Sequence, residues 1–261
     1  MSAGRDLVVM CADTGAVVAL TESAGTLRTV VFLTTGETLW AVDTPRRPVL
    51  AAGGRSVRLS TVAAVTTSPA HVVRGEPLDA RTVPLNLALT ADPAAMEVSL
   101  PTPARLVRVA GTVTVGSVIH RVDGHGWSSP TTGAARARAV FQDGSALFAA
   151  AGDTAAALVV NTAARPVPLA GLTVEGPTPP RRLRCDLSGR RPATVRAEIR
   201  DTEQHLTYVE PSPDGAGWLT WTATPAVFVR AGLTGLGLVE RTAPAASPRP
   251  APTTEGLPDP Y

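Results

Sequence analysis

The residues best suited to chemistry gather in one short stretch, where His120, Asp123 and His125 are followed by Trp127. The two histidines and Asp123 offer at most a three-ligand metal set, and structural or surface histidines are the commoner outcome. A histidine held among apolar side chains can instead hydrogen-bond a substrate carbonyl, and an indole can pack on an apolar ligand and donate one hydrogen bond. We therefore take His120, Trp127 and Asp123 as candidate catalytic residues and expect no bound metal ion. The alternative is that Trp127 fills the end of a barrel and His120 bonds a backbone carbonyl.

A predicted β-hairpin positions these residues. Valines alternate with polar or small residues over 107–115, which is the period of a β-strand. Gly116-Ser117 predicts a two-residue loop, since glycine supplies the positive φ of a type II′ turn. Residues 123–126 (DGHG) are expected to break the returning strand, because glycines let a backbone turn sharply or approach another element closely. Before that break, one face of the strand carries Val118, His120 and Val122.

The remainder of the chain reads as short strands. Apolar segments of strand length alternate with turns, and a second hairpin is centred on Asp143-Gly144, a sequence that favours a type I′ turn. Because no segment shows a convincing helical period, we predict an all-β fold of antiparallel strands. Prolines near residue 103 indicate a domain junction. The expected divisions are an N-terminal barrel-like domain at 1–103, a C-terminal barrel at 104–242 and a proline-rich extended tail at 243–261.

Aromatic side chains are few, so each is a candidate wall of an apolar pocket. Trp218 and Trp221 should face opposite sides of a regular strand, because an odd number of positions separates them. Most of these rings are expected to fill cores or corners; the functional interpretation is that Trp127 and one of the later tryptophans line a pocket. The candidate substrate-binding residues are Trp40, Val118, Val122, Tyr208, Trp218 and Trp221.

Composition excludes several classes of function. All 24 basic residues are arginine, which removes Schiff-base chemistry and a P-loop lysine; GC-rich coding is the favoured explanation of the missing lysines. Nucleotide and nucleophile-elbow motifs are absent, so no cofactor is expected. Scattered arginines and a net charge of +2 argue against a nucleic-acid partner. Cys11 and Cys185 are too isolated to suggest a disulfide or a metal site. Without a signal-peptide pattern or a membrane-spanning apolar run, we expect a cytoplasmic protein with no membrane insertion.

The hairpin and the glycines after it resemble the C-terminal half of a family of proteins with two lipocalin-like domains. That family includes carotenoid 1,2-hydratases, terpenoid cyclases and lipocalin-like Diels–Alderases, and several bacterial members carry the motif G-x-G-x-R-D-H-S-W-G. The glycines of this frame are matched by Gly124, Gly126 and Gly133. The positions of the family's Arg, Asp, His and Trp are held by Ser128, Ser129, Pro130 and Thr132. The resemblance covers residues 105–241 and continues through Phe141–Gly144, Leu183–Leu187 and Gly235–Glu240.

The resemblance implies lipocalin-like β-barrels, two of them packed together, with an apolar pocket in one barrel or between them. Because Ser and Pro replace the Asp-His pair, the obvious proton donor is missing, whereas a cycloaddition needs none. The expected function is a cofactor-independent cyclase of natural-product biosynthesis, a Diels–Alderase-type pericyclase acting on an apolar polyene, polyketide or terpenoid. One alternative is a non-catalytic carrier of such a metabolite. Another is a proton-driven terpenoid cyclase or hydratase with Asp123, Glu37 or Glu240 as the acid.

Overall fold

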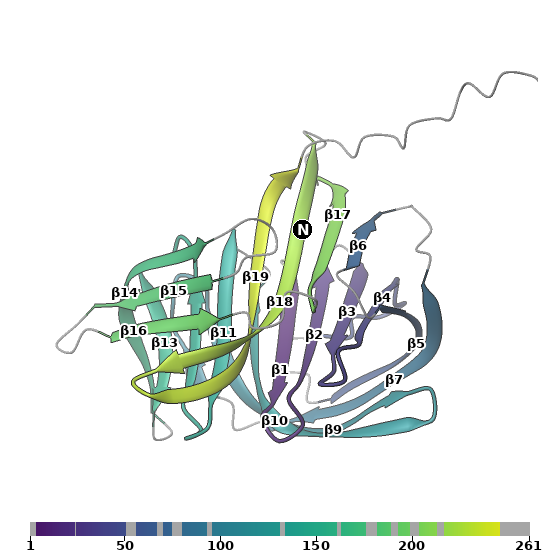
Figure 1. Cartoon of the computed structure of the whole chain (residues 1–261), viewed down its shortest axis with the longest axis horizontal. Coiled ribbons are helices and arrows are strands. Elements are labelled where there is room, and N and C mark those ends of the chain that lie inside the picture. Colours follow the sequence, from purple (N-terminus) through teal and green to yellow (C-terminus); the bar gives the residue numbers. More distant parts are fainter. Residues whose placement is uncertain are drawn as a thin grey trace, which may run out of the picture.

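The computed structural model is built from strands, and no helix occurs in the part of the chain that it describes. Both sheets close on themselves, giving two antiparallel barrels of eight strands each, as in lipocalins (Figure 1). This confirms the predicted all-β class. The described residues are 4–23, 25–50, 56–66, 70–74, 80–92, 96–130, 134–160, 163–175, 182–188, 193–198, 204–212 and 217–245. No helix in these ranges could cross a membrane.

The first barrel follows the chain as a meander, and β9 and β10 complete it because β10 pairs with both β9 and β1. A short strand, β8 (Met96–Val98), extends the sheet beside β9. The barrel strands are β1 (Arg5–Cys11), β2 (Ala16–Ser23), β3 (Thr26–Phe32), β4 (Thr38–Asp43), β5 (Ser56–Thr66), β7 (Arg81–Ala91), β9 (Ala104–Val115) and β10 (Val118–Pro130).

The second barrel closes because its last two strands pair with its two outer strands: β19 pairs with β11, and β18 pairs with β16. Its strands are β11 (Ala135–Phe141), β12 (Ala146–Ala150), β13 (Ala155–Val160), β14 (Ala163–Glu175), β15 (Arg182–Leu187), β16 (Ala193–Glu198), β18 (Trp218–Arg230) and β19 (Leu233–Ala245). The first half of β18 and the last part of β19 project beyond the barrel. Strand β17 (Leu206–Pro211) pairs with the projecting part of β18. Strand β6 (Ala70–Val73), from the first half of the chain, adds to β17 in parallel, so the first half contributes one strand to the second sheet.

The change from one sheet to the other lies between β10 and β11 rather than near residue 103. Prolines 101 and 103 only separate β8 from β9, which pairs back onto β7 within the first barrel. Residues 104–130 therefore belong to the same barrel as β1. The predicted tail also begins later, since residues 243–245 pair with β18. Residues 246–261 lie outside the described ranges.

Strand β10 runs without interruption through the segment 123–126, which was expected to break it. The glycines instead permit close approach to β1: a Cβ at Gly124 would lie 2.3 Å from the carbonyl oxygen of Met10. The predicted turn at Gly116 is present, with a φ of +58°. The second hairpin differs, because only Gly144 has positive φ and Phe141 N bonds Ser145 O across a longer loop. This arrangement is a turn with a glycine bulge instead of a type I′ turn.

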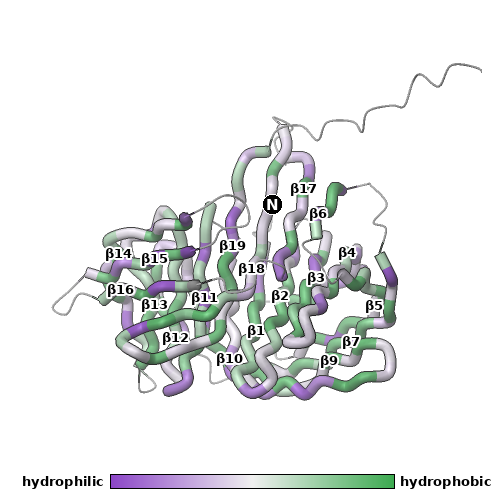
Figure 2. The backbone as a smooth tube through the Cα atoms, viewed as in Figure 1, coloured by the Kyte–Doolittle hydropathy of each residue, from purple (hydrophilic) through white to green (hydrophobic). Residues whose placement is uncertain are grey.

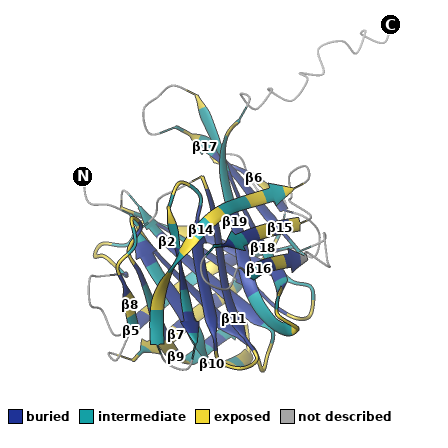
Figure 3. Ribbon diagram, turned by 90° about the vertical axis from the view of Figure 1, so that its left-hand side faces the viewer, coloured by how far each residue is buried: buried dark blue, intermediate teal, exposed yellow. Residues whose placement is uncertain are grey.

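Three apolar cores result from the alternation of side chains along these strands. One fills the first barrel, one fills the second, and the third lies between the barrels. Strand β1 sends Val9 into its barrel and Val8 into the middle core, while β11 does the same with Ala139 and Val140. Both strands are consequently buried on two faces, as Figure 3 shows for β11, and hydrophobic stretches mark β1 and β2 in Figure 2. We call the layer between the barrels the seam.

Cys11 and Cys185 are buried, free thiols inside the first and second barrel respectively. Burial raises the pKa of both, that of Cys185 to about 12. We expect neither thiol of the folded protein to react with Ellman's reagent at mildly alkaline pH, and both to react after denaturation. In the unfolded chain these groups ionise near pH ~8.5, so the free energy of unfolding should fall above that pH. Rapid labelling of the folded protein would contradict the placement.

The approach of β10 to β1 predicts a steric cost at Gly124. We expect Gly124→Ala to lower the free energy of unfolding by about 1–3 kcal/mol, because the new methyl group meets a backbone oxygen that cannot move aside cheaply. Gly171→Ala is the matched control, since a Cβ there has no atom within 4 Å. Urea unfolding monitored by circular dichroism measures both; equal stabilities of the two variants would show that the strands part easily at this point.

Candidate functional site at the seam between the barrels

The seam collects most of the large aromatic side chains of the chain in one layer. From the first half of the chain it receives side chains of β1–β4, β6 and β8–β10, and from the second half those of β11–β13 and β17–β19. Its largest apolar members are Met10, Phe32, Trp40, Leu106, Trp127, Phe148, Tyr208, Trp221 and Leu238. Two polar groupings interrupt this layer, one among the aromatic rings and one beside Trp127.

The aromatic grouping consists of Trp40, Tyr208 and Trp221, which we call the aromatic cluster. The ring centroids of Trp40 and Tyr208 are 5.0 Å apart, and those of Trp40 and Trp221 are 6.3 Å apart. Tyr208 and Trp221 are direct neighbours on β17 and β18. Trp40 reaches them from the first barrel, so the cluster exists only because the projecting strands lie across β4.

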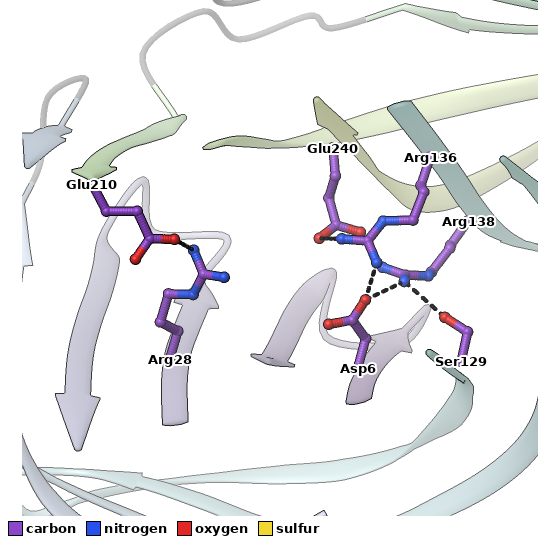
Figure 4. A network of polar contacts seen from close by, with 7 residues as sticks. All are labelled: Asp6, Arg28, Ser129, Arg136, Arg138, Glu210 and Glu240. Carbon is purple, nitrogen blue, oxygen red and sulfur yellow. Dashed lines mark hydrogen bonds and ion pairs between the residues drawn. The ribbon is translucent and has the colours of Figure 1, made fainter. Parts of the chain in front are cut away.

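Arg28 and Glu210 place charge at the edge of this cluster. The Arg28 guanidinium lies 5.5 Å from the ring centre of Tyr208 and 5.2 Å from that of Trp221, which is cation–π range. It also donates to Glu210 over 3.3 Å (Figure 4). The side chains of this ion pair keep 12% and 26% of their surface exposed, so the pair forms the partly exposed edge of the cluster. Burial and the charge of Glu210 raise the pKa of Tyr208, which stays a neutral phenol at ordinary pH.

Trp221 adds an unused hydrogen-bond donor. Its side chain is 4% exposed, and its buried indole Nε1 has no hydrogen-bond partner among the described residues. A buried indole N–H normally finds an acceptor, and leaving one without a partner costs about 1–3 kcal/mol. The N–H and the neighbouring guanidinium are therefore two donors at one aromatic wall.

The second polar grouping is a buried ionic network of five residues. Arg136 and Arg138 extend from β11, each contacts both Asp6 on β1 and Glu240 on β19, and Arg138 also donates to Ser129 on β10 (Figure 4). The Arg136–Glu240 and Arg138–Asp6 contacts are 3.2 and 3.0 Å. All five side chains are at most 4% exposed. Two positive and two negative charges thus balance inside the seam; Asp6 comes from the first barrel, and the two arginines and Glu240 come from the second.

Burial and the shared carboxylates act in opposite directions on these arginines. Burial works against the charge of Arg136, but Glu240 and Asp6 outweigh it and raise the pKa. For Arg138 burial dominates and lowers the pKa despite the same carboxylates. The guanidinium group remains charged in either case at ordinary pH. Glu240 and Asp6 each accept hydrogen bonds from both arginines.

The sequence-based catalytic residues are distributed over different environments. Trp127 is fully buried in the seam, where its ring lies 5.7 Å from that of Phe148 and its Nε1 donates to Ala139 O over 3.5 Å. His120 is half-buried on the opposite face of β10, seven positions away, so the two side chains do not line one pocket. Asp123 is exposed and pairs with Arg108 at 3.2 Å. His125 lies on the opposite face from His120, and no three His, Cys, Asp or Glu side chains of the described residues form a metal-type group.

The substrate-binding candidates divide in a similar way. Trp40, Tyr208 and Trp221 come together in the aromatic cluster, whereas Trp218 is half-buried on the other face of β18. Val122 lies in the core of the first barrel, and Val118 is exposed at the hairpin tip.

Sequence reasoning missed Arg28, Glu210 and most of the ionic network. The pairs that form these groupings join residues 182, 130 and 102 positions apart, so no local pattern connects them. One signal was present: Arg136 and Arg138 alternate with alanines in a strand, which places two charges on one face. Ser129, at the position of an Asp in the resembled family, pairs directly opposite Asp6 of β1.

The ionic network predicts a large effect of removing one charge. We expect Glu240→Gln to lower the free energy of unfolding by about 3–5 kcal/mol, because two buried arginines would then share one carboxylate. Replacing Arg138 with Met in the same variant should recover part of the loss. Glu97→Gln, which breaks the exposed Arg105–Glu97 pair, is the matched control and should change stability by less than about 1 kcal/mol. Unfolding in urea measures all three; a Glu240→Gln protein as stable as wild type would contradict the predicted cost.

Comparison with known proteins gives structural likenesses only. No protein-family model and no curated protein sequence matches the chain. It is similar to the crystal structure of kievitone hydratase from Nectria haematococca, with a TM-score of 0.46 and 13% identity over 93% of this chain and 88% of that one. It is also similar to CghA, with a TM-score of 0.47 and 9% identity over 94% and 89% of the two chains. CghA with Sch210972 gives a TM-score of 0.45 and 11% identity over 94% and 89%.

Proposed function

We propose that the protein is a cofactor-independent cyclase of natural-product biosynthesis that acts on an apolar polyene at the aromatic cluster of the seam. The observation that carries this proposal is the pairing of an aromatic wall with two directed donors. Trp40, Tyr208 and Trp221 supply the wall, while Arg28 and the unpartnered Nε1 of Trp221 supply the donors.

Aromatic rings suit a conjugated chain because both are flat and apolar. Burial of apolar surface stabilises such a complex by about 25 cal/mol per Å². The partly exposed Arg28–Glu210 pair marks the side from which the polyene enters, and its guanidinium can turn from the carboxylate toward a carbonyl oxygen of the substrate. The ligand class that fits is thus a polyene ending in an acyl group.

The proposed reaction is an intramolecular [4+2] cycloaddition. Two carbon–carbon σ bonds form at the expense of π bonds of the diene and dienophile, so no proton, electron or leaving group is exchanged. Holding the two partners in the reactive fold can lower the barrier by up to ~10 kcal/mol. Negative charge develops on the activating carbonyl in the transition state, and each well-placed donor there contributes roughly 3 kcal/mol more.

The charges of the protein favour this reaction over a proton-driven one. Each acid considered for proton transfer is already in an ion pair: Glu240 with buried arginines, Asp123 with Arg108 and Glu37 with Arg81. An initiating acid must reach the substrate with its carboxyl group, and these arginine contacts already occupy the three carboxyl groups. The remaining alternative is a carrier that binds the same polyene at the same cluster without converting it.

We expect Trp221→Phe to lower the rate of cyclisation about 10- to 100-fold, because it removes one donor and keeps the ring. The assay uses linear trienes joined by a short tether to an enone, with product and stereoisomer ratio followed by chromatography and mass spectrometry. Trp218→Phe is the matched control, since Trp218 lies on the other face of β18, and it should react as wild type. Far-UV circular dichroism and melting temperature establish that both variants fold.

The same assay separates the alternatives. Saturable quenching of tryptophan fluorescence by the polyenes without product would favour the carrier. If Trp221→Phe converts a substrate at the wild-type rate, the aromatic cluster is not the site of the reaction.

A further inference from the structure

A second arginine lies beside the ion pair at the edge of the aromatic cluster. Arg74 directly follows β6, and its guanidinium is 3.9 Å from the carboxylate of Glu210, which also accepts from Arg28. We propose that Arg74 is a positioning residue that holds Glu210 when Arg28 turns from this carboxylate to a carbonyl oxygen of the ligand. This role rests on the function proposed for the aromatic cluster, because it concerns the binding of the same polyene.

The pairing of β6 with β17 brings Arg74 to this place. Val72 stands opposite Tyr208, and both side chains lie in the seam. Two positions further along each strand, Arg74 and Glu210 are therefore on the same face. The backbone N–H of Arg74 donates to the carbonyl oxygen of Val209 over 2.9 Å, which fixes the residue at this position. The parallel strand thus brings another guanidinium to the edge of the cluster.

Glu210 divides its two carboxylate oxygens between the two arginines. Its Oε1 accepts from Nη1 of Arg28 at 3.3 Å (Figure 4), while its Oε2 is 3.9 Å from Nη1 of Arg74. The longer distance is that of an ion pair without a hydrogen bond, so this contact has room to shorten. The Arg74 side chain is 58% exposed, whereas that of Arg28 is 12% exposed and lies over the aromatic rings. The two cations therefore hold the carboxylate from a wet side and a dry side.

Arg28 cannot bind a ligand without a change at Glu210. When its guanidinium turns to a carbonyl oxygen, the carboxylate loses that contact, and only about a quarter of its side chain is exposed. Taking the partner from a partly buried charge is unfavourable, because water replaces the lost contact only in part. Arg74 already lies at the other oxygen and can move closer. It lowers the cost of freeing Arg28, so that more of the interaction with the carbonyl appears as affinity.

The charge of Arg74 also acts on the aromatic wall. Burial and the charge of Glu210 raise the pKa of Tyr208, while Arg74 and Arg28 oppose this rise. Both arginines are thus close enough to Tyr208 to influence the same ring. This proximity is expected of a residue that takes part in the exchange of partners at Glu210.

The test measures binding of two polyenes that differ in one carbonyl group, followed by quenching of tryptophan fluorescence. One is the triene tethered to an enone, and the other is its analogue with a plain alkene. Wild type should bind the enone more tightly. Arg74→Gln should weaken binding of the enone about 2- to 5-fold, the range of an exposed ion pair, and leave binding of the analogue unchanged. In a Glu210→Gln background Arg74→Gln should have no effect, because no carboxylate remains to be held.

Arg184→Gln is the matched control, because Arg184 is 53% exposed and pairs with Asp186 on β15, which lies far from β6 in Figure 1. It should bind both polyenes as wild type does. Arg74→Lys keeps the charge and should retain most of the affinity for the enone. Far-UV circular dichroism establishes that each variant folds.

Three results would overturn the role of Arg74. They are an Arg74→Gln protein that binds the enone as wild type does, equal weakening for both polyenes, which indicates a structural role in holding β6, and a wild type that does not distinguish the two ligands. Binding is read without turnover, so a protein that binds the enone and forms no product disproves the cyclase and leaves these outcomes decisive. If wild type binds neither polyene, the proposed function and this role both fall.

Discussion

Two arginines and two carboxylates buried between the barrels constrain everything around them. Taken singly, each would cost several kcal/mol to remove from water, so all must remain together once the barrels meet. Asp6 and Ser129 come from one barrel and Arg136, Arg138 and Glu240 from the other, which fixes how β1 and β10 face β11 and β19. An apolar seam alone would tolerate sliding, whereas these directed contacts specify one register. The aromatic cluster depends on that register, because Trp40 and Tyr208 belong to different barrels.

The strands at the seam are buried on both faces, and this limits the size of the side chains that each face can hold. Strand β11 presents only the small side chains of Ala137 and Ala139 to the core of its own barrel. On its other side, in the seam, Trp127 contacts the backbone of Ala139. On β10, Gly124 and Gly126 allow β1 to approach closely enough to bring Asp6 opposite Ser129. A strand at the seam, such as β11, can therefore contribute small residues to its barrel core on one face and large residues to the seam on the other.

Local patterns in the sequence were sufficient for the fold class and for the hairpin at Gly116, because strand alternation and turn chemistry depend on neighbouring residues. They were insufficient for the extent of β10: glycine is compatible with a turn or with close packing, and only β1 decides between them. The same limit applies to the site. Trp40, Tyr208 and Trp221 were recognisable as scarce aromatic residues, but Arg28 reaches them by a contact spanning 182 positions. Trp127, chosen for its place after the glycines, faces the seam and uses its donor on Ala139.

The distribution of charge is also the reason for proposing a reaction without proton transfer. Acid catalysis needs a carboxyl group that is buried, protonated and free to face the substrate. Here the buried carboxylates of the seam are engaged by arginines, and releasing one would leave buried guanidinium groups with fewer partners. What the seam can offer without losing its own stability is shape, aromatic surface, the buried indole N–H of Trp221 and the Arg28 guanidinium at its partly exposed edge. Those are the requirements of a cycloaddition, in which the substrate supplies all the bonding electrons and the protein supplies the arrangement.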